Sequence, residues 1–186
     1  MSTDDTTVST TGSRPRPVGR REERDAGPTL VLERTFRAPV EDVWAAVTEP
    51  QRLDRWIGTW TGDPASGQVL FRMTAEGDDV RAEPTTVHAC DPPRRLVLSW
   101  DAGPSAGGRW HVELDLTEVG EVGEVTTLTF AQRVPDTATG RDVGPGWEYY
   151  LDRLVAAHTG GDVSAVAWSD YEDMAGYYEA LFADLG

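Results

Sequence analysis

Apolar and polar residues alternate in short runs through the middle of the chain, with clusters of Gly, Pro and Asp between the runs. The cleanest alternation is in 109–116, where apolar residues take every second position. Other runs occupy 29–36, 68–74, 80–90, 94–101 and 125–132, with a weak one at 58–61. Alternation of this kind predicts an antiparallel sheet with one face on the core and the other in water.

Helical spacing appears in three places. After the first strand, Val40, Val43 and Val47 form an apolar stripe behind Pro39, and Pro50 starts a second short helix. Near the end of the chain a longer helix is predicted from about Pro145 to His158, before Gly160-Gly161. Its apolar residues are Trp147, Leu151, Leu154 and Val155. A last helix near 169–184 is predicted from a capping box of Ser169 and Glu172.

These elements predict an α+β fold in which the long helix covers one face of the sheet, because nothing else remains to cover it. We expect one domain over 29–186, with 159–186 as a C-terminal extension. The segment 1–28 has almost no large apolar residues and is predicted to be a disordered tail. A helix resting on a curved sheet also leaves room for a pocket between the two.

The charge argues against two classes of partner. The chain has a net charge of −15, all of it on 29–186 because 1–28 is balanced, and all 17 basic residues are arginine. An acidic surface repels phosphate backbones and anionic lipids, so we expect neither nucleic-acid nor membrane binding.

No run is apolar enough to span a membrane, and no secretory signal is expected. The single cysteine, Cys90, suits a reducing compartment, most simply the cytoplasm.

Residues that carry chemistry are sparse. His88, Cys90 and His111 lack the spacing of a zinc site, so no metal or other cofactor is predicted. With His88 and Cys90 two residues apart, their side chains are expected on one strand face, and Cys90 is interpreted as packing rather than as a nucleophile. Glu148 and Asp152 lie opposite the apolar stripe of the long helix, where two like charges slightly destabilise it. No acid–base pair stands out, so no catalytic residue is predicted.

Aromatic residues are the remaining signal, with seven tryptophans in 186 residues. They could line a ligand cavity or simply fill the core, since each buried ring stabilises the fold by about 1.5–3 kcal/mol. The predicted cavity lining is Phe71, Met73, His88, Leu98, Trp100, Trp110, Val112, Phe130, Trp147, Tyr150, Leu151 and Leu154. Arg72, Thr86, His88 and Tyr150 are the polar groups that could orient a ligand there.

The chain resembles the START-like helix-grip superfamily (SRPBCC, the Bet v 1-like fold), in its branch of Hsp90-ATPase-activator homologues. The resemblance covers about 29–158 and rests on Arg37-Ala38-Pro39 leading into Val43-Trp44, on Leu53 with Trp56, and on Gly146-Trp147 with Leu151 and Leu154. The segment 170–178 also resembles the usual ending of that branch. The family implies a seven-stranded antiparallel sheet around a long C-terminal helix, with two small helices after the first strand. These motifs specify the fold far better than the activity.

Three functions follow as hypotheses. The first is binding of a small hydrophobic or aromatic molecule between sheet and helix, without chemistry. The second, implied by the resemblance, is a co-chaperone-like contact with an Hsp90-like chaperone. The third is an enzyme, a cyclase or hydrolase, that uses the same cavity, with His88 and Arg72 as the residues to test.

Overall fold

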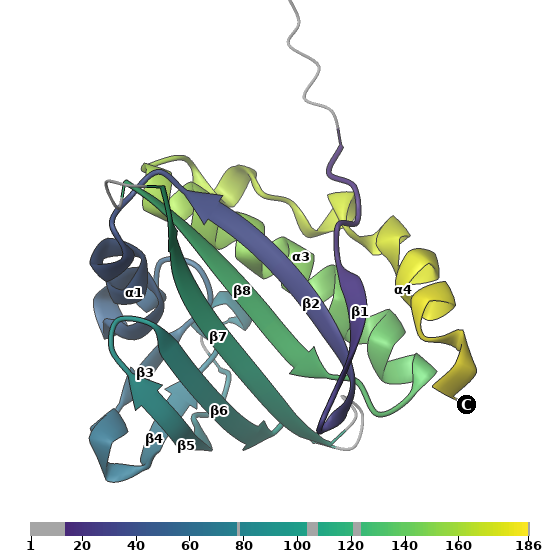
Figure 1. Ribbon diagram of the computed structural model, residues 1–186, viewed down its shortest axis with the longest axis horizontal. Helices are drawn as coiled ribbons and strands as arrows, with labels where there is room; N and C mark the ends of the chain where they lie inside the picture. Colours follow the sequence, from purple (N-terminus) through teal and green to yellow (C-terminus); the bar gives the residue numbers. More distant parts are fainter. Residues whose placement is uncertain (1–13, 78, 104–107, 121–123, 186) are drawn as a thin grey trace, which may run out of the picture.

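An eight-stranded antiparallel sheet bends around a 23-residue helix in the computed structural model (Figure 1). The structure describes residues 14–77, 79–103, 108–120 and 124–185. The strands are β1 Arg20–Arg24, β2 Gly27–Phe36, β3 Thr59–Thr61, β4 Gln68–Arg72, β5 Glu83–Asp91, β6 Arg95–Asp101, β7 Arg109–Val119 and β8 Val125–Arg133. Their order across the sheet is β1-β2-β8-β7-β6-β5-β4-β3. The predicted α+β helix-grip fold is confirmed.

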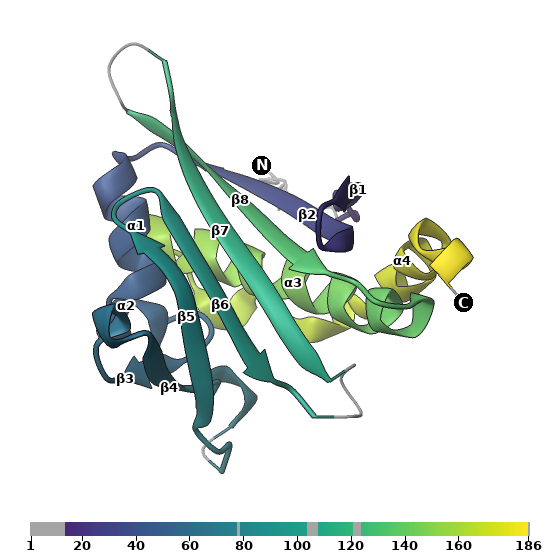
Figure 2. The same ribbon diagram turned by 60° about the horizontal axis from the view of Figure 1, so that its bottom comes forward.

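The helices lie on the concave face of the sheet and beyond its edge. They are α1 Val40–Thr48, α2 Pro50–Leu53, α3 Thr137–Thr159 and α4 Ala175–Leu181. Single 3-10 turns are η1 Pro64–Ser66, η2 Thr74–Glu76, η4 Val163–Ala165, η5 Trp168–Asp170, η6 Glu172–Met174 and η7 Ala183–Leu185. Figures 1 and 2 show α1 and α3 on the same side of the sheet, with α4 beside α3.

The first strand corrects the prediction for the tail. Arg20–Arg24 pairs with β2 in antiparallel register, with Arg20 opposite Val31, although the sequence predicted disorder over 1–28. An edge strand is held by backbone hydrogen bonds and needs few apolar side chains, which is why composition missed it. Residues 1–13 of the predicted tail lie outside the described residues.

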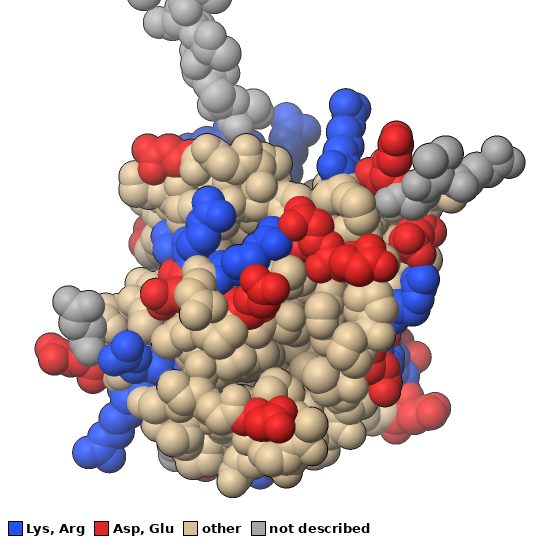
Figure 3. Space-filling view, turned by 90° about the vertical axis from the view of Figure 1, so that its left-hand side faces the viewer, with Lys and Arg blue, Asp and Glu red and all other residues tan. Residues whose placement is uncertain are grey.

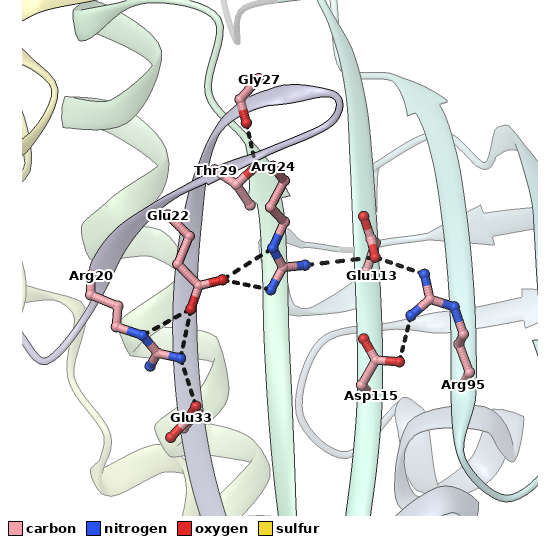
Figure 4. A network of polar contacts seen from close by, with 9 residues as sticks. All are labelled: Arg20, Glu22, Arg24, Gly27, Thr29, Glu33, Arg95, Glu113 and Asp115. Atoms are coloured by element: carbon pink, nitrogen blue, oxygen red, sulfur yellow. Dashed lines mark hydrogen bonds and ion pairs between the residues drawn. The ribbon is translucent and has the colours of Figure 1, made fainter.

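Ion pairs cross the convex face of the sheet (Figure 4). Arg20 forms an ion pair with Glu33 at 2.8 Å. Arg24 forms ion pairs with Glu22 at 3.1 Å and with Glu113 of β7 at 3.7 Å. Arg95 continues the chain to Glu113 at 2.8 Å. These side chains are partly exposed, so each pair contributes less than about 1 kcal/mol, but together they tie β1 to strands it does not pair with.

Charges of both signs also mix on the face formed by α1 and α2. Figure 3 shows Arg side chains beside Asp and Glu across the middle of this face, with mostly uncharged residues below them. One such pair joins Arg52 of α2 to Asp42 of α1 at 2.8 Å. The acidic surplus is therefore not concentrated on this face.

Helix α3 begins eight residues before its predicted start. Asp136 caps it by accepting a hydrogen bond from the Thr139 amide at 2.7 Å, and Pro145 lies inside the helix. The stretch with Gly140, Gly144 and Pro145 is typical of a loop, but tertiary packing favours a helix there. A Cβ on Gly144 would lie 2.1 Å from the Tyr178 ring, so the glycines let α4 approach α3 closely.

Helix α4 is shorter than predicted. It begins at Ala175 without a capping side chain, so the predicted Ser169–Glu172 capping box does not start a continuous helix. Large side chains of the segment are nonetheless buried, with Tyr178 and Phe182 both 0% exposed. Two separate 3-10 turns replace the predicted first turns of the helix.

A buried carboxylate joins α3, α4, β2 and the segment before β1. Glu148 is 1% exposed and accepts hydrogen bonds from the Val18 amide at 2.6 Å and the Tyr178 hydroxyl at 2.5 Å. Its other oxygen accepts from Arg34 at 2.7 Å, and Arg34 also donates to Asp152 at 2.8 Å. The predicted repulsion between Glu148 and Asp152 is therefore offset by a shared arginine.

We expect this cluster to make the protein sensitive to alkali. Burial, then the neighbouring Glu148 carboxylate, raises the pKa of the Tyr178 phenol above its ordinary 10.0. Above that pH the unfolded chain releases a proton that the folded protein keeps, so stability falls as pH rises. The loss is about 1.4 kcal/mol per pH unit for one such group.

The measurement is urea denaturation of the protein and of Tyr178→Phe at several pH values above neutrality. The variant starts from a lower stability because it loses the bond to Glu148, but its stability is expected to fall less steeply above about pH 10. Equal slopes for the two proteins would show that Tyr178 does not cause the alkaline loss.

Candidate ligand-binding cavity

An open cavity of about 940 Å³ lies between the first half of α3 and strands β4 to β7. Its lining residues are Phe71, Met73, Ala75, Glu76, Val80, Arg81, Glu83, Trp100, Asp101, Ala102, Gly103, Trp110, Asp142, Val143, Gly146, Trp147, Tyr149, Tyr150 and Trp168. Ligand pockets in proteins usually measure about 300–1,000 Å³, so this cavity is large enough for an organic molecule. The long helix therefore covers the sheet without filling the space under its N-terminal half.

Seven aromatic rings form one continuous wall of this cavity. Each ring contacts the next, with centroids between 5.1 and 6.2 Å apart, in the order Phe71, Trp100, Trp110, Trp147, Tyr150, Tyr149 and Trp168. The contacts are tilted or edge-on, which is the geometry that aromatic pairs prefer. The wall runs from the sheet, across α3, to the 3-10 turn η5.

Two hydrogen bonds fix rings of the wall. The Tyr150 hydroxyl donates to Glu76 of η2, which connects the helix to the segment between β4 and β5. The Trp147 indole donates to the side chain of Gln132 on β8. Among the described residues, the buried amide nitrogen of Gln132 has no hydrogen-bond partner. Both bonds hold the α3 rings against the sheet side of the cavity.

A second, smaller cavity of about 50 Å³ lies deeper, toward α1 and α2. Phe71, Trp100 and Trp147 border both cavities, so these three rings separate them. The smaller space is enclosed by apolar side chains such as Ile57 and Leu96. It holds at most a water molecule or two, and the larger cavity is the site with room for a ligand.

The structure brings half of the predicted lining together around the larger cavity. Six predicted residues border it: Phe71, Met73, Trp100, Trp110, Trp147 and Tyr150. Leu98, Val112 and Phe130 border the smaller one. Leu151 and Leu154 border neither cavity and are fully buried in the core. For these two leucines the structure therefore favours the alternative in which the side chains fill the core rather than line a cavity.

The polar groups proposed from sequence are mostly misplaced. His88 is exposed on the convex face, where its ring nitrogen lies 2.7 Å from Ser99 Oγ. Thr86 pairs with Ser99 and so faces the same way, and Arg72 is exposed and borders neither cavity. Only Tyr150 reaches the cavity. The two residues named as candidates for chemistry, His88 and Arg72, are therefore outside it.

A β-bulge explains why His88 and Cys90 do not share a face. The register of β5 against β6 shifts between Val87 and Ala89, and Cys90 packs on the core while His88 faces water. One inserted residue reverses the side on which the following residues lie. Burial raises the pKa of the Cys90 thiol, which suits packing rather than nucleophilic attack. No group of three or more potential metal ligands forms among the described residues.

The sequence missed several residues of the site. Tyr149 and Trp168 complete the aromatic wall, and Glu76, Glu83 and Asp142 also line the cavity. Tyr149 lies off the apolar stripe of its helix, and Trp168 lies in a 3-10 turn where no periodicity marks a face. The available signal was the density of aromatic residues, since the segment 147–171 contains Trp147, Tyr149, Tyr150, Trp168 and Tyr171.

No helix of the described chain is long and apolar enough to cross a membrane.

Solved structures share this fold over most of the chain. CalU16 from Micromonospora echinospora is 27% identical with a TM-score of 0.67, over 89% of this chain and 96% of that one. The BPP1335 protein of Bordetella parapertussis is 26% identical with a TM-score of 0.59, over 86% and 91%. EF2215 of Enterococcus faecalis is 17% identical with a TM-score of 0.65, over 91% and 92%. A search of curated proteins finds no match.

A family model gives the assignment directly. The model described as "Activator of Hsp90 ATPase homolog 1-like protein" matches residues 37–159, from the turn before α1 to the end of α3. That match covers well over half of the chain and includes most of the cavity wall. The chain therefore belongs to the Activator of Hsp90 ATPase homolog 1-like family, within the helix-grip fold.

Proposed function

We propose that this protein binds a small, mainly apolar aromatic molecule in the cavity beside α3. The observation that carries the proposal is the continuous wall of seven rings along an open space of about 940 Å³. Trp100, Trp147 and Tyr150 are only 4–7% exposed and also pack in the core. The other four rings, Phe71, Trp110, Tyr149 and Trp168, are half-buried or exposed, so a planar ligand would chiefly cover these four and gain the burial free energy.

Gly146 offers a direct test, because it borders the cavity and a Cβ built on it meets nothing within 4 Å. A leucine at this position projects into the cavity and occupies ligand space. Replacing glycine by leucine inside a helix also favours the helix by up to about 1 kcal/mol. We therefore expect Gly146→Leu to lose ligand binding while keeping its thermal stability.

The experiment is thermal denaturation of the protein and its variants with a library of planar aromatic compounds. Gly176→Leu is the matched control, since Gly176 is also helical, its Cβ also meets nothing within 4 Å, and it borders neither cavity. Compounds that raise the Tm of the parent and of Gly176→Leu, but not of Gly146→Leu, support the proposal. No shift for any compound, or the same shift in all three proteins, contradicts it.

The family description names a second candidate, contact with an Hsp90-like chaperone. Large apolar side chains that are exposed among the described residues come from separate elements, such as Leu70 on β4, Val119 on β7 and Tyr177 on α4. Scattered residues of this kind are ordinary surface rather than a docking patch. Stimulation of a chaperone ATPase by both the parent and Gly146→Leu would favour this candidate over ligand binding.

A further inference from the structure

Charged residues at the cavity are mostly acidic. Four carboxylates border it, namely Glu76 in η2, Glu83 at the start of β5, Asp101 at the end of β6 and Asp142 on α3. The only guanidinium among the lining residues that the structure describes is that of Arg81. The four carboxylates come from four different elements, so the acidic character of the lining does not belong to one segment of the chain.

These carboxylates are not neutralised by the protein. Many acidic side chains elsewhere in the described structure are paired, as Glu113 is with Arg24 and Arg95. In contrast, no ion pair within 4 Å forms at any of the four cavity carboxylates among the described residues. Glu76 accepts the Tyr150 hydroxyl, and Asp101 accepts the Gly103 amide at 2.8 Å. Both bonds position a carboxylate but leave its charge uncompensated.

Aromatic faces and unpaired carboxylates favour the same kind of molecule. The π-face of an aromatic ring is negative and attracts an organic cation, most strongly where water is excluded. The structure already contains one such contact, with the Arg153 guanidinium 5.3 Å from the centroid of the Tyr149 ring. A cavity lined by both aromatic rings and carboxylates therefore presents two attractions to one positive charge.

From this arrangement we propose that the ligand is an organic cation, a planar aromatic molecule that carries a protonated nitrogen. The aromatic rings lie along the wall of Trp100, Trp110 and Trp147, and the positive charge lies near the cavity carboxylates. This inference rests on the proposed function and adds the charge of the ligand. The net charge of −15 adds a long-range attraction for a cation, and salt screens this attraction.

The test compares tricyclic probes of one shape and three charges: cationic aminoacridine, neutral acridine and anionic anthracene carboxylate. Binding is measured by quenching of tryptophan fluorescence, at a pH where acridine is uncharged and at low and high salt. We expect the cation to bind about tenfold more tightly than acridine at low salt, with a difference that shrinks at high salt. The anion is expected to bind most weakly.

Variants separate the local carboxylates from the overall charge. Glu83→Gln with Asp142→Asn removes two cavity carboxylates that form no side-chain hydrogen bond among the described residues. Glu41→Gln with Glu172→Gln changes the net charge equally at exposed positions that border neither cavity. The double variant at Glu83 and Asp142 is expected to bind aminoacridine about five- to tenfold more weakly and to bind acridine with unchanged affinity. The control double variant is expected to change the affinity for either compound by less than about twofold.

The outcomes distinguish this inference from the proposed function. Equal affinity for aminoacridine and acridine, or tighter binding of the anion, overturns the cationic ligand and leaves the proposed function standing. Loss of cation binding to the same extent in both variant pairs also overturns it, because the overall charge then explains the preference. Failure of every probe to bind, with no Tm shift from the aromatic library, overturns both.

Discussion

Gly144→Ala is expected to destabilise the protein by about 2–3 kcal/mol, although alanine favours a helix over glycine by about 1 kcal/mol. The added methyl group would lie 2.1 Å from the Tyr178 ring, which is 0% exposed. Neither side can yield cheaply, because Tyr178 is bonded to Glu148 and Gly144 is inside α3. The methyl group must therefore push α4 away from α3.

Gly146→Ala is the control in the same helix, two residues away. Its Cβ meets nothing within 4 Å, so only the helix preference remains and the variant is expected to be more stable by up to about 1 kcal/mol. Urea denaturation of both variants gives the two changes in free energy of unfolding. Changes of the same sign and similar size would show that the close approach of α4 does not constrain Gly144.

Sequence patterns predicted every strand except β1 because those strands bury apolar side chains on one face, whereas β1 has no buried residue. In β7 the alternation of 109–116 matches buried Val112, Leu114 and Leu116, and the register places them beside β8. Even the weak run at 58–61 forms β3. A period of two follows directly from strand geometry, so these elements are encoded locally.

Features that depend on contacts between distant segments were not predictable in this way. Pro145 is compatible with a helix interior because α4 and the sheet pack around α3, which no local pattern reveals. Arg34 occupies the core face of β2 between Leu32 and Phe36, and only the fold shows that Glu148 meets it. A bulge reverses the face of Cys90 without a glycine or proline to mark it.

The cavity could be predicted only in part. Alternation placed Trp100 and Trp110 on the inner face, and helical spacing placed Trp147 opposite them. Whether those rings fill the space or border it depends on the distance between helix and sheet, which is set by the whole chain. Trp168 reaches the wall from a 3-10 turn beyond α3, where no periodicity marks a face, and only the density of aromatic residues from 147 to 171 pointed to it.

Glu148→Leu is expected to destabilise the protein by about 3–5 kcal/mol, because it leaves a buried arginine with half of its charge partners. Arg34 would keep Asp152 at 2.8 Å but lose the bond to Glu148 at 2.7 Å. The amide of Val18 would also lose its acceptor, and the amide of Gly19 would keep only the Tyr178 hydroxyl at 3.2 Å. Each buried polar group left without a partner adds about 1–3 kcal/mol to the cost.

Two further variants separate the charge from the packing. Glu179→Leu removes an exposed glutamate that pairs with Arg141 at 3.6 Å, and its effect is expected to stay below about 0.5 kcal/mol. Arg34→Leu combined with Glu148→Leu removes both charges, so its cost should fall below the sum of the two single variants by about 2 kcal/mol or more. Additive costs in this double-mutant cycle, measured by urea denaturation, would contradict a coupled buried pair.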